Sequence, residues 1–339
     1  MSVSPGVAIL GSGIIGLSTA IVAADEGLEV TIYSRTDGVT YGPTDASDKG
    51  GSVWFPALLG GDASKVDVWA SDSYEMFSEL SRKPTSGVTA TTEIELIDEV
   101  KSFQNPPKCV ASINGFQATP SHLLGSRLPE ATCGVWQFPT YIVSMPSYLP
   151  FLHDEAGSRG IRIVRRAFDS PEQVNDLTEP AIVNCTGLGA AKLFGDRTLT
   201  AVKGHLLSFD PVDFPMTIGR NEFLLVPRAD ALLLGVLYLK EFDSLAPQAS
   251  DRDTILTEIH SWQQMDLLGL GLGRLDLTCD RIMDERCGLR PYRPGGVRLE
   301  RDPASSKILI HNYGHGGSGV TTSWGCAIDA VQLLMGALR

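Results

Sequence analysis

The sequence is short of cysteine, of positive charge and of long apolar runs, and each shortage excludes a class of protein. Its six cysteines (109, 133, 185, 279, 287 and 326) include no CxxC pair, which favours buried reduced thiols over disulfides or a zinc site. No apolar run approaches the roughly 18 residues that a membrane-spanning helix needs. The formal net charge of −12 argues against nucleic acid or an anionic membrane as a partner.

The remaining composition is that of an ordinary globular protein. Of the 339 residues, 43% are hydrophobic and 20% are charged, and this length suits two domains. The N-terminus runs into the first apolar segment with no basic region and no signal-peptide cleavage site. We therefore expect a cytoplasmic protein of two domains that holds no metal. The sequence leaves the oligomeric state open, with a homodimer as the candidate assembly.

The stretch Gly6–Arg35 has the order of parts of a dinucleotide-binding unit. Residues 7–10 form a short apolar run typical of a buried parallel strand, residues 17–26 are rich in alanine and helical in character, and residues 30–33 supply a second strand. A GxGxxG motif lies between the first strand and the helix. Because the motif stands in the context that it requires, the stretch predicts a bound dinucleotide.

Each glycine of the motif has a physical role in that prediction. Gly11 permits a tight turn, Gly13 lets backbone N–H groups approach a pyrophosphate, and Gly16 lets the helix pack on the strand. The helix N-terminus, with Ile14 and Ile15, carries a partial positive charge that favours phosphates. We expect these five residues to contact the cofactor.

The end of the second strand should show which dinucleotide binds. A carboxylate there would accept hydrogen bonds from the ribose hydroxyls, yet Tyr33 is followed by Ser34 and Arg35. Asp37 lies about twenty residues beyond the glycines, near the expected distance, but past the expected end of the strand. Arg35 could instead hold a ribose or a phosphate by its planar fork. The motif alone leaves FAD, NAD and NADP open.

Two more glycine-containing turns follow strands later in the chain. The strand 181–184 leads into Thr186 and Gly187, and the strand 308–313 leads into the turn 314–319 and an apolar helix. Turns of this kind point backbone N–H groups at a ligand. Because the first and last of them stand at opposite ends of the chain, we predict one sheet built from both ends, with a second domain inserted. A long ligand held on several faces favours FAD.

Two other segments allow two interpretations each. The loop 40–61, dense in Gly, Pro and Ser, is either a surface loop or, through the pair Gly50-Gly51, a backbone contact to a cofactor ring. The segment 288–294 is expected to break regular structure and to bring Arg290, Arg293 and Arg298 close together. These arginines either face solvent or recognise an anion.

Together the segments resemble the D-amino-acid oxidase family of FAD flavoproteins over nearly the whole chain. The resemblance rests on GSGIIGLSTA at 11–20, the Trp54-x-Pro56 loop, IVNCTGLGA at 182–190, GLRPYRPGGVRLE at 288–300 and HNYGHGGSGVTTSWGCA at 311–327. The last two motifs are specific to the family.

The resemblance implies an α/β fold. A Rossmann-like FAD-binding domain with a parallel sheet would be interleaved with a substrate domain built on a mixed or antiparallel sheet. We assign residues 1–57, 141–199 and 285–339 to the first domain and residues 58–140 and 200–284 to the second.

The resemblance also implies the residues of the site. Arg290 would bind the substrate carboxylate, Tyr238 would add a hydroxyl contact, and the backbone carbonyl of Gly317 would receive the substrate amino group. Phe223 and Trp54 are expected to line the substrate pocket. The residues expected to bind FAD are Gly11, Gly13, Ile14, Ile15, Gly16, Arg35, Gly51, Ser52, Thr186, Gly187, Gly314, Gly316, Gly319, Val320 and Thr321.

The implied reaction is the oxidation of a neutral D-amino acid. A hydride would pass from Cα to flavin N5, oxygen would yield hydrogen peroxide, and water would release ammonia and a 2-oxo acid. Phe223 stands where family members carry a tyrosine, and the arginine of the D-aspartate branch is absent near Tyr238, which favours neutral side chains. Oxidation of glycine, sarcosine or another secondary amine, and a flavin-binding protein without turnover, are the alternatives.

Overall fold

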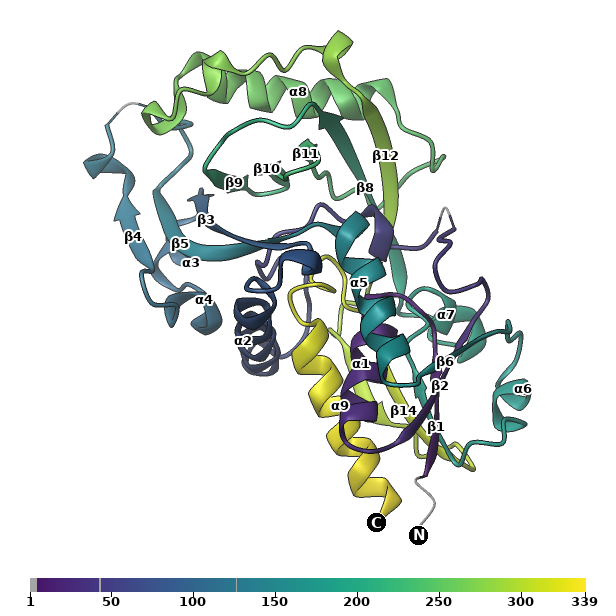
Figure 1. Cartoon of the computed structure of the whole chain (residues 1–339). Coiled ribbons are helices and arrows are strands. Elements are labelled where there is room, and N and C mark those ends of the chain that lie inside the picture. Colours follow the sequence, from purple (N-terminus) through teal and green to yellow (C-terminus); the bar gives the residue numbers. More distant parts are fainter. Residues whose placement is uncertain (1–4, 43, 126) are drawn as a thin grey trace.

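Two sheets organise the molecule in the computed structural model (Figure 1), which describes residues 5–42, 44–125 and 127–339. A six-stranded sheet lies near both chain termini, and an eight-stranded sheet forms the other end of the molecule. Residues 1–4, 43 and 126, which fall in the expected segments 1–57 and 58–140, lie outside the described residues. The expected α/β class is confirmed, with one sheet that is parallel except at one edge and one mixed sheet.

The six-stranded sheet is the Rossmann-like unit. Its strands are β1 (Gly6–Leu10), β2 (Glu29–Ser34), β6 (Arg162–Arg165), β7 (Ala181–Asn184), β13 (Arg298–Arg301) and β14 (Ile308–Tyr313). They are ordered β13-β14-β7-β1-β2-β6, and all neighbours are parallel except β13 and β14. The central strands β1 and β7 are apolar and buried, as strands covered on both faces must be. The two ends of the chain therefore meet in one sheet.

The eight-stranded sheet is mixed. Its strands are β3 (Val88–Ile97), β4 (Gln117–Pro120), β5 (Gly134–Val143), β8 (Thr200–Phe209), β9 (Met216–Arg220), β10 (Phe223–Pro227), β11 (Leu232–Gly235) and β12 (Asp284–Tyr292). They are ordered β12-β8-β11-β10-β9-β3-β5-β4, and only β3 and β9 are parallel neighbours among the described strands. The helix α8 (Ala249–Gln264) packs Ile255, Ile259 and Trp262 against one face. Because side chains alternate along a strand, the other face can line a cavity.

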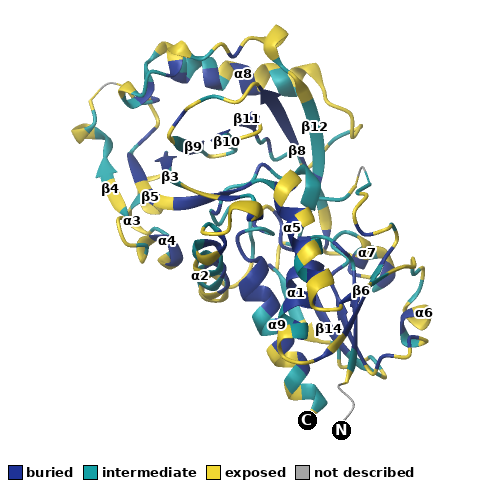
Figure 2. Cartoon of the chain, in the orientation of Figure 1, coloured by how far each residue is buried: buried dark blue, intermediate teal, exposed yellow. Residues whose placement is uncertain are grey.

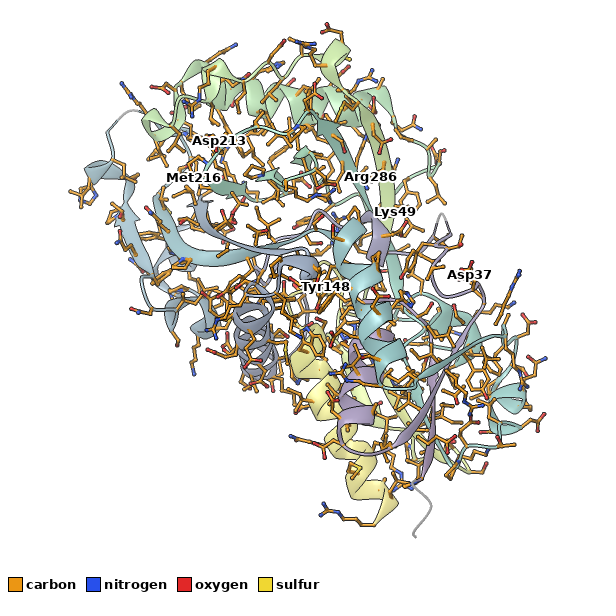
Figure 3. All side chains as sticks on the ribbon, viewed as in Figure 1. Asp37, Lys49, Tyr148, Asp213, Met216 and Arg286 are labelled. Carbon is orange, nitrogen blue, oxygen red and sulfur yellow. The ribbon has the colours of Figure 1, made fainter. Side chains whose placement is uncertain are left out.

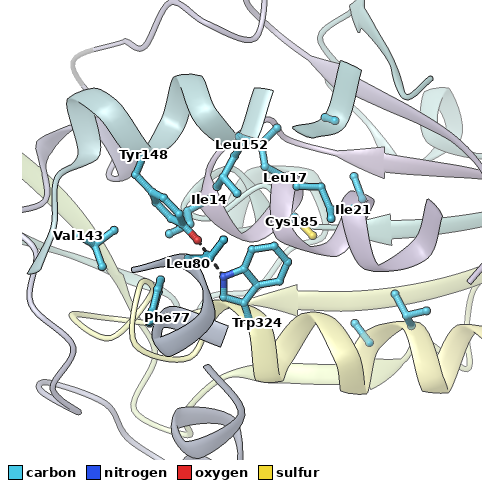
Figure 4. Packing of buried hydrophobic residues seen from close by; sticks show 14 of the residues in the cluster. Ile14, Leu17, Ile21, Phe77, Leu80, Val143, Tyr148, Leu152, Cys185 and Trp324 are labelled. Atoms are coloured by element: carbon cyan, nitrogen blue, oxygen red, sulfur yellow. Dashed lines mark hydrogen bonds between the residues drawn. The ribbon is translucent and has the colours of Figure 1, made fainter. Parts of the chain in front are cut away.

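Four helices pack together beside the six-stranded sheet (Figure 1): α1 (Ile14–Asp25), α2 (Ala63–Leu80), α5 (Met145–Ser158) and α9 (Ser323–Leu338). Among the buried polar contacts of their shared core, the indole Nε1 of Trp324 donates to the Tyr148 hydroxyl over 2.8 Å (Figure 4). A Cβ at Gly325 would lie 2.7 Å from the carbonyl carbon of Trp69, so the close approach of α2 and α9 requires glycine there.

The shorter helices lie at the surface. They are α3 (Val100–Gln104), α4 (Lys108–Ala111), α6 (Pro171–Asn175) and α7 (Gly189–Leu193), together with the 3-10 turn η1 (Ser47–Lys49). Figure 2 shows the contrast between α6, which is largely exposed, and β8, which is buried along most of its length. No helix in the described ranges is long and apolar enough to cross a membrane.

The structure corrects the placement of two segments. The expectation that residues 288–294 break regular structure is wrong, because residues 284–292 form β12 and pair with β8. Pro291 is tolerated there because β12 is an edge strand. Residues 285–292, which we assigned to the FAD-binding segment, therefore lie in the eight-stranded sheet. The helix α2, which we assigned to the substrate segment, packs on α9.

Candidate active site

A groove of about 350 Å³ follows the carboxyl ends of β1, β7 and β14. Ligands of open parallel sheets bind at this edge. All three glycine-containing turns contribute to its lining. Gly11 has a φ of +108° and Gly187 a φ of +55°, a conformation that only glycine adopts without strain. The turns therefore bring backbone, rather than side chains, to the floor of the groove.

Most of the residues predicted to bind the cofactor line this groove. They are Gly11, Gly13, Ile14, Ile15, Arg35, Ser52, Thr186, Gly187, Gly316, Gly319 and Val320. Sequence reasoning missed several polar side chains that line it as well, namely Ser12, Tyr41, Ser47, Arg166 and His315. Ser12 stands inside the GxGxxG motif and Ser47 in η1, and the others come from separate segments, so no local pattern joins all five.

Three predicted residues act beside the groove rather than in its lining. A Cβ at Gly16 would collide with the carbonyl of Gly11, so this glycine serves the packing of α1 on β1. Gly314, at a φ of +88°, lies against the side chain of Arg293. The Thr321 hydroxyl donates to the carbonyl of Phe55 over 2.9 Å and holds the loop before α2. A fourth, Gly51, lines the neighbouring cavity described below.

The polar groups of the groove suit an anion with hydrogen-bonding groups. Its wall includes the N-terminus of α1, where the Ile14 N–H donates to Ser47 Oγ over 3.0 Å and the N-cap residue Gly13 offers no side chain. His315 is buried, its Nε2 has no hydrogen-bond partner among the described residues, and burial lowers its pKa to about 3. The ring is therefore neutral and can pair with a ligand in the groove.

Asp37, the carboxylate near the distance expected for ribose recognition, does not line the groove. Its carboxylate accepts hydrogen bonds from the backbone N–H groups of Val39 (3.1 Å) and Thr40 (2.7 Å) and so caps its own turn. Arg35 lines the groove and forms an ion pair with Asp45.

A second cavity of about 150 Å³ adjoins the groove on the face of the eight-stranded sheet opposite α8. We call it the inner cavity. On β8, for example, Leu206 lines it whereas Leu207 packs beneath α8. The residues that line both spaces are Ala46, Gly50, Ser52, Leu289, Arg290, Gly317 and Val320. Ligands in the two spaces would therefore meet at these residues.

Arg290 lies at this junction because alternation along β12 points it toward the inner cavity. Its guanidinium has room beside Gly204, where a Cβ would lie 2.7 Å from Cζ. Nη1 donates to the carbonyl of Leu237 over 3.1 Å, and Cζ lies 5.0 Å from the ring centre of Tyr238. No acidic side chain in the described ranges pairs with it, and burial lowers its pKa. Its remaining donors can bind a planar anion such as a carboxylate.

Tyr238, Phe223 and Gly317 also line the inner cavity. The backbone N–H of Tyr238 donates to Oε2 of Glu222 over 2.9 Å, which fixes the segment after β11. Burial raises the pKa of the Tyr238 phenol, so the hydroxyl stays protonated and can donate. The carbonyl oxygen of Gly317 accepts no hydrogen bond from any described residue, which leaves it available as an acceptor.

Trp54 does not line the inner cavity, so its expected place in the substrate pocket is wrong. Its side chain is fully buried, its indole Nε1 donates to the carbonyl of Ala70 over 3.0 Å, and its ring meets Tyr74 edge-on. The flanking residues Val53 and Phe55 line the cavity instead. A large aromatic residue in a loop gives no signal in the sequence of which side it faces.

The three arginines near β12 do not gather at one site. Nε of Arg293 pairs with Asp196 over 3.0 Å, and Nε of Arg298 pairs with Glu300 over 2.7 Å. Of these three, Arg290 alone reaches the inner cavity.

Sequence reasoning missed most of the charge in the inner cavity. Glu93, Glu95 and Glu222 line it on one side, and Lys49 and Arg286 line it near β12, where Figure 3 shows them close together. Glu93 and Glu95 alternate with Ile94 and Leu96 in β3. Such alternation is typical of a strand with one face in water, whereas both glutamates are buried, at 1% and 7% exposure.

Comparison with known proteins agrees with this geometry. A sequence model of the family described as FAD dependent oxidoreductase matches residues 6–333. D-amino-acid oxidase from Streptomyces coelicolor is 29% identical over 345 residues and covers 96% of each chain. D-amino-acid oxidase from Rubrobacter xylanophilus is 28% identical and covers 97% of this chain and 96% of that protein.

The fold is shared with solved structures as well. Glycine oxidase from Geobacillus kaustophilus has a TM-score of 0.75 at 19% identity and covers 98% of this chain and 95% of that chain. The resemblance on which the sequence analysis relied is thus confirmed over nearly the whole length. The chain belongs to the family of FAD dependent oxidoreductases, with FAD as its cofactor.

Proposed function

We propose that the protein oxidises D-amino acids to 2-oxo acids, with release of ammonia and hydrogen peroxide. The observation that carries the proposal is Arg290, a guanidinium without an acidic partner among the described residues, at the junction of the groove and the inner cavity. It can anchor a substrate carboxylate beside the cofactor. Full-length similarity to proteins named D-amino-acid oxidase supports the same reaction.

The groove fits FAD in its polar groups. The free backbone of the Gly11 turn and the N-terminus of α1 suit a pyrophosphate. His315, buried with an unpartnered Nε2, can pair with a polar group of the cofactor. Ser52, Gly317 and Val320 border both spaces and would lie where the cofactor meets the substrate.

The contribution of the chain is to bind and orient the substrate. Arg290 would hold the α-carboxylate, the Tyr238 hydroxyl would donate to it, and the Gly317 carbonyl would accept from the amino group. These contacts fix two groups of the substrate, the carboxylate and the amino group. With the side chain placed in the inner cavity as a third point, they decide which face of Cα is presented and hence which enantiomer reacts. Bound FAD would take the hydride from Cα and pass its electrons to oxygen. No general base is needed at Cα, since the amino group is neutral when the hydride leaves.

Anaerobic reduction of the bound flavin tests this proposal. The flavin absorbance should bleach with members of a D-amino-acid panel and stay unchanged with their L enantiomers. Bleaching by glycine or sarcosine alone would favour an amine oxidase. Phe223, which lines the inner cavity, is compatible with this alternative. A flavin that no amine bleaches would contradict any oxidase activity.

A further inference from the structure

We propose that the inner cavity selects D-amino acids whose side chain carries a positive charge, bound by Glu93 and Glu95. This inference rests on the proposed oxidase function and names its substrate class. It replaces the expectation of neutral side chains, which came from the absence of an arginine near Tyr238.

The fold brings the two carboxylates together. Glu93 and Glu95 stand two apart on β3, so both point to the face opposite α8, while Ile94 and Leu96 pack in the core beneath that helix. A Cβ at Gly219, on the neighbouring strand β9, would collide with Oε2 of Glu95 and lie 3.0 Å from Oε1 of Glu93. Glycine at 219 therefore leaves space that both carboxylates reach.

Neither carboxylate has a positively charged partner in the described part of the chain. Thr217 donates to Oε2 of Glu93, but Oε1 is buried without any hydrogen-bond partner. The charged side chains that act on Glu95 are both acidic, Glu93 and Asp98. Burial raises the pKa of both glutamates, and the charge of Glu93 raises that of Glu95 further. A buried carboxylate pair is costly unless a cation matches it, and an incoming ammonium or guanidinium group would do so.

The cations of the same cavity do not favour an acidic side chain instead. Lys49 forms an ion pair with Asp48. Nε of Arg286 lies 3.5 Å from a carboxylate oxygen of Asp284 without a hydrogen bond, and its Nη2 donates to Ser208 Oγ over 3.3 Å. Those positive charges already have acidic partners, whereas Glu93 and Glu95 have none. The cavity therefore offers one cation without an ion-pair partner, Arg290, and a pair of carboxyl groups without a cationic partner, which an incoming cation would draw into their ionised form.

The two unmatched groups belong to one binding site. Glu93, Glu95, Tyr238 and Arg290 all line the inner cavity, and the ring centre of Tyr238 lies 5.0 Å from Cζ of Arg290. A D-amino acid with its carboxylate on Arg290 and a cationic side chain reaching toward β3 would match both ends.

Two substrates of nearly equal shape test the inference. D-arginine carries a guanidinium group, and D-citrulline carries a neutral urea group in its place. We expect kcat/KM to be at least roughly 30-fold higher for D-arginine, because one charge partner of a buried pair is lost with D-citrulline. Glu95→Gln and Glu93→Gln should remove most of that ratio. Glu75→Gln, at an exposed position of α2, should leave the ratio unchanged.

The possible results separate the inference from the function on which it rests. Efficient turnover of D-citrulline or D-leucine with no preference for D-arginine would overturn the inference and leave the oxidase intact. A preference for D-glutamate would overturn it as well and would indicate that Lys49 and Arg286 bind the side chain of the substrate. Flavin that no D-amino acid reduces would contradict the proposed function itself. If both glutamine variants fail to fold, the ratio between D-arginine and D-citrulline in the unaltered enzyme still decides.

Discussion

Replacing Arg290 by alanine should leave FAD bound and remove the anchor for the substrate carboxylate. Within the described structure the guanidinium makes one hydrogen bond, to the Leu237 carbonyl, and lies against the ring of Tyr238. Its loss should cost the folded protein about 1 kcal/mol. The substrate loses far more, because its carboxylate would enter the inner cavity unmatched. That loss is about 2–5 kcal/mol, or roughly 30-fold to several thousand-fold in kcat/KM.

The measurement is kcat/KM for the best D-amino acid, together with the FAD content of each variant. Arg290→Lys should recover part of the loss, because an ammonium group cannot offer two parallel donors. Tyr238→Phe should cost about 1 kcal/mol, or roughly 5-fold, since only one hydroxyl is removed. Arg293→Ala and Arg298→Ala serve as controls, because both side chains have their own partners outside the cavity. The reasoning fails if Arg290→Ala keeps normal efficiency while either control abolishes it.

Three further predictions test other parts of the structure. The purified protein should be yellow and release FAD on denaturation, and a colourless protein that binds NAD would contradict the assignment. Gly13→Val should lower the FAD content, because a side chain there would enter the groove near Ser47. Gly204→Ala should raise KM with little change in FAD content, because the Cβ of the introduced alanine would displace the Arg290 guanidinium. An unchanged KM would refute that contact. Burial opposes ionisation of Asp196, but hydrogen bonds from Thr198, Tyr313 and Arg293 outweigh it and lower the pKa. The ionised Asp196 therefore stabilises the folded protein above about pH 4, and this stabilisation is lost as the pH falls further. Asp196→Asn should flatten the acid side of a curve of Tm against pH. An unchanged curve would show that Asp196 does not contribute to the stability of the fold.

The parts of the fold that local pattern determines could be predicted from the sequence. The unit from β1 to β2 follows from an apolar run, three glycines and a helix, because each acts on its immediate neighbours. Residues 284–292 were harder, since proline and glycine indicate a break, and only pairing with β8 at the edge of the sheet makes a strand of them. Arg290 could be named only through resemblance, because nothing in its own segment distinguishes it from Arg293.

The acidic residues of the inner cavity could not be predicted from the sequence. Glu93 and Glu95 have the alternation of a solvent-exposed strand face, and their burial depends on strands β8 to β12, which lie more than a hundred residues later. The direction of the Trp54 side chain could not be predicted from the sequence either. Its loop borders the inner cavity, but whether its ring enters the cavity or the core is decided by contacts with Ala70 and Tyr74.

Oxygen consumption with paired enantiomers tests the central claim most directly. The enzyme should consume oxygen with members of a panel that includes D-arginine, D-alanine and D-leucine, and added catalase should return half of that oxygen, because two molecules of hydrogen peroxide yield one of oxygen. The L enantiomers should give no consumption above background. Equal rates with the L enantiomers, or consumption with glycine and sarcosine alone, would contradict the account of Arg290 as the anchor of a D-amino acid.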